Sequence, residues 1–268
     1  MTEPTGPVGV VTGASSGIGA ACARALARRG TTVVGVARRA DRLAAVLDGC
    51  REHAPSSIAS VCDLADLDAA RRVVTDTIER FGRLDVLVLN AGMPMRRRVQ
   101  DLSERQVHEV LQLNYLSPVA MTLAALPHLL ARRAGTIVIV SSLVGRLGNG
   151  GEAAYCATKF ALCGFAEAAS VDLSGTGVEV RLILPGPIDT EMWLDHDGQD
   201  KPAYEGERFA PELVADAVVN ALSSTTVETY VPDLKSIVEM KTTDFQGFRD
   251  GMVAALHGEA PVLLPDEP

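Results

Sequence analysis

The sequence has little that would suit it to bind nucleic acid or to cross a membrane. Its formal net charge is -9, whereas binding to phosphate backbones needs an excess of cations. No stretch approaches the roughly 18 consecutive apolar residues of a membrane-spanning helix. The segment 1–7 has no basic stretch followed by an apolar one, which is the pattern of a secretory signal. We therefore expect a cytoplasmic protein that has neither nucleic acid nor a membrane as its partner.

Cysteine and histidine are few and scattered. The five cysteines are odd in number and have no C-x-x-C spacing, so they indicate neither a disulfide frame nor a structural zinc site; they are Cys22, Cys50, Cys62, Cys156 and Cys163. The five histidines form no ligand cluster either. We expect free thiols, no bound metal, and hence no zinc-dependent dehydrogenase.

What the chain does have is the composition of an ordinary globular protein. Its 268 residues are 47% hydrophobic and 22% charged, which is enough for one large α/β domain with a substantial core. Short apolar, β-branched runs predict strands at 8–12, 32–37, 58–62, 86–90, 136–141, 179–184 and 228–231. The segments between them predict helices at 17–29, 41–53, 66–81, 103–132, 152–174 and 211–223.

Most of these strands are apolar nearly throughout, as strands covered on both faces are. Their alternation with helices predicts a Rossmann-type, doubly wound sheet of seven parallel strands with helices on both faces. No linker or internal repeat interrupts the pattern, so we expect a single domain over residues 1–257. The remaining residues, 258–268, are expected to form a C-terminal tail.

A glycine-rich turn joins the first predicted strand to the first helix. The segment 12–19 reads TGASSGIG, in which Gly13, Gly17 and Gly19 allow a tight turn and a close approach of the backbone to a pyrophosphate. The N-terminus of the helix adds unpaired N–H groups, and Ser15 and Ser16 can add hydroxyl donors. This arrangement predicts a dinucleotide site.

The end of the second strand bears on which dinucleotide binds. NAD-preferring sites usually carry an acid there to bond the ribose hydroxyls, but the sequence has Ala37 followed by Arg38 and Arg39. Arginines suit a 2′-phosphate, which a carboxylate would repel. We therefore favour NADP(H) over NAD(H). At the end of the third strand, Asp63 and Leu64 are expected to flank the adenine.

Tyr155 and Lys159 lie four positions apart in a predicted helix and so share one face. A free tyrosine titrates near 10, and a nearby ammonium would favour its phenolate. Ser142 ends the fifth strand, and Asn90, Ala91 and Gly92 end the fourth, where the carboxyl ends of strands face the ligand crevice. Within the long predicted helix 103–132, the asparagine at position 114 interrupts an apolar run and demands partners if it is buried.

In this order of motifs the chain resembles the short-chain dehydrogenase/reductase family over roughly residues 8–232. The matching residues are Thr12, Gly13, Gly17, Ile18, Gly19, Asn90, Ala91, Gly92, Asn114, Ser142, Tyr155, Lys159, Pro185 and Gly186. Two positions depart from the family pattern: Leu89 stands where a second asparagine is common, and Ser16 where NADP-preferring relatives often carry a base.

The resemblance implies a role for each of these residues. Tyr155 would be the general acid/base, Ser142 would polarise the carbonyl, and Lys159 would hold the nicotinamide ribose and lower the tyrosine pKa. Asn114 would carry a water that links Lys159 to solvent. Residues expected beside the nicotinamide are Pro185, Gly186, Ile188 and Thr190.

The substrate is less defined by the sequence. Residues 191–210 lack periodicity and follow the nicotinamide segment, where members of the family often carry a mobile lid. Candidate substrate residues are Met93, Met95, Gly148, Met192 and Trp193. They are compatible with an apolar ketone or alcohol, although the three methionines and Trp193 could equally anchor the lid to the body. The helix 152–174 is apolar on most faces, which predicts a homodimer or homotetramer.

Four hypotheses follow. The leading one is an NADPH-linked oxidoreductase that interconverts a carbonyl and an alcohol. The second is a reductase of 3-oxoacyl groups on a carrier protein, docked by Arg132 and Arg133, although these two arginines are better read as solvated surface. The third is a non-catalytic dinucleotide sensor, which would have no need of the acid/base residues. The fourth, a nucleotide-sugar epimerase or dehydratase, usually has a longer C-terminal domain and a G-x-x-G-x-x-G turn.

Overall fold

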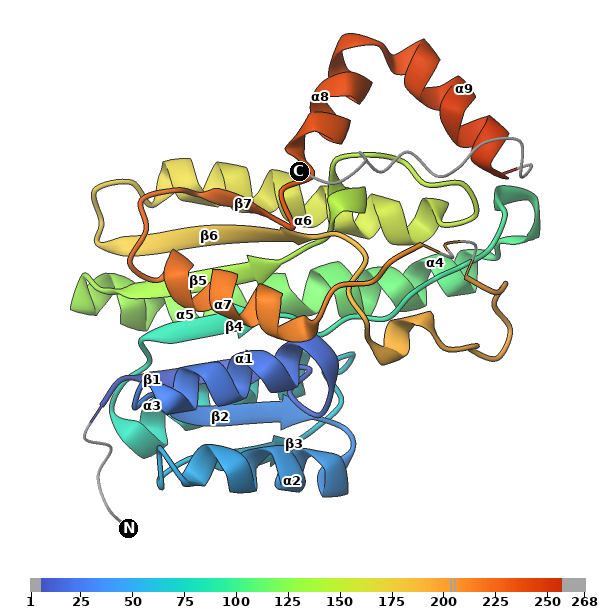
Figure 1. Ribbon diagram of the computed structural model, residues 1–268. Coiled ribbons are helices and arrows are strands. Elements are labelled where there is room, and N and C mark those ends of the chain that lie inside the picture. Colours follow the sequence, from blue (N-terminus) through green and yellow to red (C-terminus); the bar gives the residue numbers. More distant parts are fainter. Residues whose placement is uncertain (1–5, 203, 205, 257–268) are drawn as a thin grey trace.

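The computed structural model, which describes residues 6–202, 204 and 206–256, contains the predicted parallel sheet (Figure 1). Its strands are β1 (Val8–Thr12), β2 (Thr32–Ala37), β3 (Ile58–Val61), β4 (Val86–Leu89), β5 (Gly135–Val140), β6 (Val178–Pro185) and β7 (Glu228–Val231). They pair in the order β3-β2-β1-β4-β5-β6-β7, all parallel. Every predicted strand occurs, with its ends shifted by at most one residue, and the doubly wound fold is confirmed.

Helices cover both faces of the sheet. One layer consists of α1 (Gly17–Arg28), α2 (Ala40–Arg51) and α7 (Pro211–Ala221). The other consists of α3 (Leu67–Phe81), α5 (Ser117–Arg132) and α6 (Ala153–Asp172), with α4 (Glu104–Leu111) extending beyond the sheet (Figure 1). Because a β-strand points successive side chains to opposite faces, neighbouring residues enter different cores. Val10 packs with the α3–α5–α6 layer and Val11 with the α1–α2–α7 layer.

The predicted helix 103–132 is not one regular α-helix. Between α4 and α5 it contains a π-helical turn, η2 (Gln112–Leu116), in which Asn114 is fully buried. The whole run Glu104–Arg132 is long and apolar enough to cross a membrane by length and composition, a criterion that the core helices of soluble proteins also meet. Its residues Met121, Ala125 and Leu129 belong to the core of this fold.

Two helices near the C-terminus were not predicted. They are α8 (Lys235–Thr243) and α9 (Phe245–Leu256), which stand at one end of the molecule in Figure 1. Ile237 and Phe248 pack against Leu143 and Leu147, next to the end of β5. The helices therefore cover the wall that follows Ser142. The expected tail, 258–268, lies outside the described residues.

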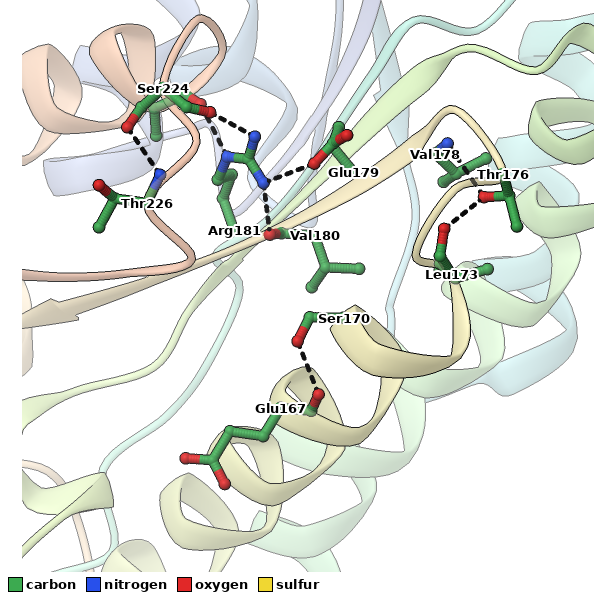
Figure 2. Close-up of polar contacts among 11 residues, drawn as sticks. Glu167, Ser170, Leu173, Thr176, Val178, Glu179, Val180, Arg181, Ser224 and Thr226 are labelled. Carbon is green, nitrogen blue, oxygen red and sulfur yellow. Dashed lines mark hydrogen bonds and ion pairs between the residues drawn. The ribbon is translucent and has the colours of Figure 1, made fainter.

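A buried arginine fixes α7 to the sheet. Arg181 on β6 is 4% exposed, and Figure 2 shows its guanidinium between the end of the helix and the strand. It donates to the carbonyls of Ala221 (3.0 Å) and Ser224 and to the Glu179 carboxylate (2.9 Å). Since the last carbonyls of a helix lack intrahelical partners, this contact satisfies the C-terminal end of α7.

Candidate active site

The sheet topology places the candidate site. Strand order reverses between β1 and β4, and ligands of open α/β sheets bind outside the carboxyl ends of the strands at such a point. The predicted residues at 12–19, 90–92, 141–142 and 185–190 all follow strand ends at this edge. One edge of the sheet thus gathers the motifs that the sequence scatters over 180 residues.

The turn after β1 has the geometry that a dinucleotide needs. Gly13 and Gly17 have φ of 69° and 51°, in the left-handed region. A Cβ on Gly19 would lie 2.3 Å from the Gly13 carbonyl oxygen, so only glycine permits this crossing. Ser16, the N-cap of α1, makes no side-chain capping bond, which leaves the first N–H groups of the helix available to a phosphate. The residues present therefore fit a pyrophosphate.

Thr12 joins this turn to the end of β4. Its hydroxyl donates to the Val88 carbonyl (3.2 Å) and accepts from the N–H groups of Asn90 (2.8 Å) and Ala91 (3.0 Å). The Asn90 amide donates in turn to the Thr12 carbonyl (3.0 Å). One threonine hydroxyl thus fixes the floor of the crevice between the two halves of the fold.

Tyr155 and Lys159 lie in the first turns of α6, and both are buried. The Lys159 ammonium lies 5.7 Å from the centre of the Tyr155 ring and donates to the Val140 carbonyl (3.3 Å). Ser142 follows β5, accepts from the Val144 N–H (3.3 Å) and lies close enough to Tyr155 to lower the pKa of its phenol. The structure therefore brings together the serine, tyrosine and lysine that the sequence predicts.

The electrostatics of this group differ from the expectation that Lys159 lowers the tyrosine pKa. Burial raises the pKa of Tyr155, the nearby Glu152 carboxylate raises it further, and the hydrogen bond with Ser142 opposes both effects. Burial also lowers the pKa of Lys159, to about 8. The phenol is therefore protonated at neutral pH in the cofactor-free protein. Stabilisation of its anion needs a further positive charge, such as that of an oxidised nicotinamide.

Asn114 is held to the backbone of Met93. Its Oδ1 accepts from the Met93 N–H and its Nδ2 donates to the Met93 carbonyl, both at 2.9 Å. The amide also donates to Thr158 (3.3 Å), which lies on α6 beside Lys159. A Cβ on Gly92 would lie 3.3 Å from Asn114 Oδ1 and 3.8 Å from Lys159 Nζ, so the asparagine and the lysine face the same small space.

Methionines form an apolar wall against the tyrosine. Met95 is buried with Val110 and Tyr155, while Met93 and Met192 pack against the same cluster from its partly buried rim. The Tyr155 hydroxyl donates to the Met192 sulfur at 3.6 Å. Three of the predicted substrate residues are thus brought together around the phenol.

The other two predicted substrate residues lie apart from this wall. The Trp193 indole donates to the Ile188 carbonyl (2.6 Å), and its ring contacts Tyr204 at 5.6 Å and Arg208 at 4.9 Å between centres. These contacts fit the alternative in which Trp193 anchors the lid. Gly148 is exposed, and an added Cβ there would meet nothing within 4 Å.

Sequence reasoning missed Arg96, which ties the segment 191–210, expected above to be a lid, to the body of the domain. Its guanidinium is buried and donates to three lid carbonyls, those of Met192 (2.7 Å), Leu194 (2.8 Å) and Asp200 (3.0 Å). Burial lowers the pKa of Arg96. Arg96 is the first of three consecutive arginines, a run that is typical of an exposed surface, so no local signal in the sequence distinguishes Arg96 from its neighbours.

The candidate adenine-side residues occupy different environments. Arg38 and Arg39 are both exposed, and Arg39 donates to Ser16 (2.7 Å) and Ser15 (3.2 Å). Asp63 is exposed and accepts from the N–H of Ala65 (3.0 Å). Leu64 is buried within the core beside β2. Arginine 39 rather than 38 therefore faces the glycine-rich turn.

The segment after β6, where the sequence predicts the nicotinamide to lie, packs against the same edge of the crevice. Ser142 donates to the Pro185 carbonyl at 3.5 Å, and Ile188 is buried. Gly186 lies so close to Leu234 that an added Cβ would be 2.7 Å from that side chain. A Cβ on Gly17 would lie 2.9 Å from the Thr190 methyl group, so Thr190 lies directly against the glycine-rich turn.

Arg132 and Arg133 are far from this edge. Arg132 ends α5 and Arg133 follows it, before β5, at the amino ends of the strands. Arg132 pairs with Asp85 (3.1 Å) and donates to the Leu84 carbonyl (3.0 Å), and Arg133 donates to the Gly175 carbonyl (3.2 Å). Their position gives no support to carrier docking at the site.

The fold and the assembled side chains define an oxidoreductase of the dinucleotide-binding α/β class. A family model described as short chain dehydrogenase matches residues 7–200. The chain is 37% identical to an L-fucose dehydrogenase of Bos taurus over 193 residues, which cover 72% of this chain and 70% of that protein. It is 32% identical to a 3-oxoacyl-[acyl-carrier-protein] reductase of Escherichia coli over 187 residues, covering 70% and 75%.

A solved structure has the same architecture. An alcohol dehydrogenase from Thermococcus sibiricus, complexed with 5-hydroxy-NADP, aligns with a TM-score of 0.74 and 28% identity, covering 84% of this chain and 95% of that one. The chain thus belongs to the short-chain dehydrogenase/reductase family, as its motifs predict, and it is an oxidoreductase.

Proposed function

We propose that the protein reduces an apolar ketone or aldehyde to an alcohol with NADPH, and that Tyr155 supplies the proton. The observation that carries this proposal is the Tyr155 phenol, kept protonated by burial beside Ser142 and facing a wall of methionines. A carbonyl oxygen placed there would accept from both hydroxyls. The bound dinucleotide would supply the hydride, with the carbonyl carbon reduced to an alcohol carbon.

Each of the other residues has a supporting role in this proposal. Ser142 donates a hydrogen bond that polarises the carbonyl and holds its oxygen near the phenol. Lys159 holds the ribose hydroxyls and offsets the negative charge left on Tyr155 after proton transfer. Asn114 holds Met93 and shares the space beside Lys159, where a water could return a proton.

The preference for NADPH rests on charge at the adenine end. The second strand ends at Ala37, which has no carboxylate to repel a 2′-phosphate. Two residues later, the Arg39 guanidinium donates to the hydroxyls of Ser15 and Ser16. The similarity to a protein solved with an NADP derivative is consistent with this choice. We expect Arg39→Ala to weaken NADPH binding with little effect on NADH, and Arg38→Ala to have a smaller effect.

A panel of carbonyl compounds tests the proposal. NADPH or NADH is mixed with apolar ketones, aldehydes, sugars and a 3-oxoacyl thioester, and cofactor absorbance is followed. Turnover of apolar carbonyls with NADPH supports the proposal. A clear preference for the thioester would favour the carrier-protein reductase instead. Tight binding of NADPH without turnover of any compound would favour the non-catalytic sensor.

We also propose a homodimer or homotetramer built on α5 and α6. Leu123 and Leu130 are 58% and 40% exposed, seven residues apart on one face of α5. Phe160 and Val171, 40% and 74% exposed, share a face of α6. A second subunit would cover these apolar side chains. Light scattering of the wild type and of Leu123→Glu tests this, with the variant expected to be smaller.

A further inference from the structure

On the side of the crevice where the adenine is expected, Arg39 and Arg42 already bind the carboxylate of Glu191, which belongs to the lid. Glu191, the first residue of η4 (Glu191–Trp193), accepts from Arg39 at 2.6 Å through one oxygen and pairs with Arg42 through the other. These partners are about 150 residues apart in the chain. The lid thus reaches across the glycine-rich turn to the start of α2.

The same arginine also faces the turn. The nitrogen of Arg39 that does not contact Glu191 donates to Ser16 (2.7 Å) and Ser15 (3.2 Å). Two guanidinium groups and two hydroxyls therefore gather at the end of β2. Guanidinium forks and hydroxyl donors are the groups that proteins use for phosphate oxygens.

We infer that Arg39, Arg42, Ser15 and Ser16 form the 2′-phosphate site, and that Glu191 is its internal competitor, displaced when NADP(H) binds. The inference rests on the NADPH preference proposed above, which it deepens. Glu191 then lowers the affinity for a 2′-phosphorylated cofactor, and its release frees η4 at the start of the lid. Arg42 becomes a determinant of cofactor specificity that the sequence pattern did not reveal.

Charge explains why the two anions compete. A 2′-phosphate carries about -1.5 to -2 at neutral pH, and Glu191 adds one more negative charge. Arg39 and Arg42 supply two positive charges, too few to neutralise both anions at one place. The hydrogen bond from Arg39 and the neighbouring Arg42 also lower the pKa of Glu191, so the carboxylate is ionised at neutral pH.

Two adenosine nucleotides test this competition by binding alone, without turnover of a substrate. Adenosine 2′,5′-bisphosphate and adenosine 5′-monophosphate differ only in the 2′-phosphate, and calorimetry measures their binding to the full chain. In Glu191→Gln, which keeps the side-chain shape, we expect the bisphosphate to bind roughly three- to tenfold more tightly, as for the loss of two exposed ion pairs. Binding of the monophosphate stays unchanged. In Arg42→Ala, bisphosphate binding weakens.

The control is Asp197→Asn, which removes the same charge from an exposed position of the same lid. It leaves the ratio of the two affinities unchanged if the contact with the arginines is what matters. An equal gain in Asp197→Asn would overturn the inference in favour of a general charge effect. Weaker bisphosphate binding in Glu191→Gln would overturn it in favour of a lid that closes over the bound cofactor.

Trp193, the single tryptophan, lies two residues after Glu191 and reports on the lid. The bisphosphate should change its emission in the wild type, whereas the monophosphate should not; an equal response to both contradicts displacement. In the wild type, the ratio of the affinity for the bisphosphate to that for the monophosphate tests the NADPH preference by itself. A ratio near one contradicts that preference. If the ratio then rises in Glu191→Gln, the competition between Glu191 and the phosphate is still upheld.

Discussion

The Asn114 side chain and the Met93 backbone pair through two reciprocal hydrogen bonds of 2.9 Å each. An isosteric change, Asn114→Leu, leaves the Met93 N–H and carbonyl without these partners in a buried place. We expect it to lower the free energy of unfolding by about 2–4 kcal/mol and to reduce turnover. Urea denaturation and NADPH-linked kinetics check both effects.

The matched control for this change is Gln112→Leu, on the same π-helical turn. Gln112 donates one hydrogen bond, to the Ala65 carbonyl at 2.9 Å, and is only partly buried. We expect it to cost about 1 kcal/mol and to leave turnover near that of the wild type. Equal losses of stability and turnover in the two variants would show that the Asn114 contact has no special role.

Arg96 is expected to control how tightly the lid closes. Arg96→Met keeps an apolar stem but removes the hydrogen bonds to the lid carbonyls. If local opening becomes easier by about 1.4 kcal/mol, trypsin should cleave after the exposed Arg208, in the same segment, about tenfold faster, and KM should rise. The exposed Arg98→Met is the control. Unchanged cleavage after Arg208 would mean that Arg96 does not hold the lid.

Much of the fold could be predicted because its signals are local. Parallel strands buried on both faces read as short β-branched runs, and each one ends within a residue of its predicted limit. Several family motifs lie at strand ends, which the topology brings to one edge. Ser142 follows β5 at that edge, and Tyr155 and Lys159 reach it from the first turns of α6.

The features that were missed depend on contacts distant in sequence. The π-helical turn is accompanied by the bonds of Asn114 to Met93, and α8 and α9 pack on Leu143 and Leu147, nearly a hundred residues earlier. Neither gives a strong periodic pattern of its own. The pairing of Glu191 with Arg39 likewise joins a loop to the start of a helix.

The pKa of Lys159 predicts how kcat/KM for reduction depends on pH in the alkaline range. Burial lowers that pKa to about 8, while Tyr155 keeps its proton well above neutral pH. As the pH rises through about 8, the ammonium is lost and the anion left on Tyr155 after proton transfer loses its neighbouring charge. We expect kcat/KM for reduction, which reports the free enzyme, to fall above that pH. A profile that stays level well beyond pH 9 would contradict this assignment.

Asp85 is expected to make stability depend on acid pH. Burial alone would raise its pKa, but hydrogen bonds from Arg83, the Val8 N–H and Arg132 lower it below the usual value. The stabilisation by this carboxylate is therefore present above about pH 4, near the unfolded-state pKa, and is lost as the pH falls through the folded-state pKa. Asp85→Asn should cost about 2 kcal/mol at pH 7.

Urea denaturation of Asp85→Asn between pH 7 and pH 3 checks this dependence. The difference from the wild type should shrink below about pH 4. Asp48→Asn, which removes an exposed ion pair with Arg51 (2.7 Å), is the control and should cost little at any pH. A difference for Asp85→Asn that is constant with pH would mean that its charge is not what stabilises the fold.

The measurement that tests the central claim most directly is single-turnover reduction by Tyr155→Phe, with NADPH binding measured on the same sample. The change removes one oxygen and its proton from a buried ring. If Tyr155 is the proton donor, NADPH affinity stays within about twofold, while the rate of reduction falls by about 10²- to 10⁴-fold. Reduction at the wild-type rate, with NADPH bound as tightly as before, would contradict the account.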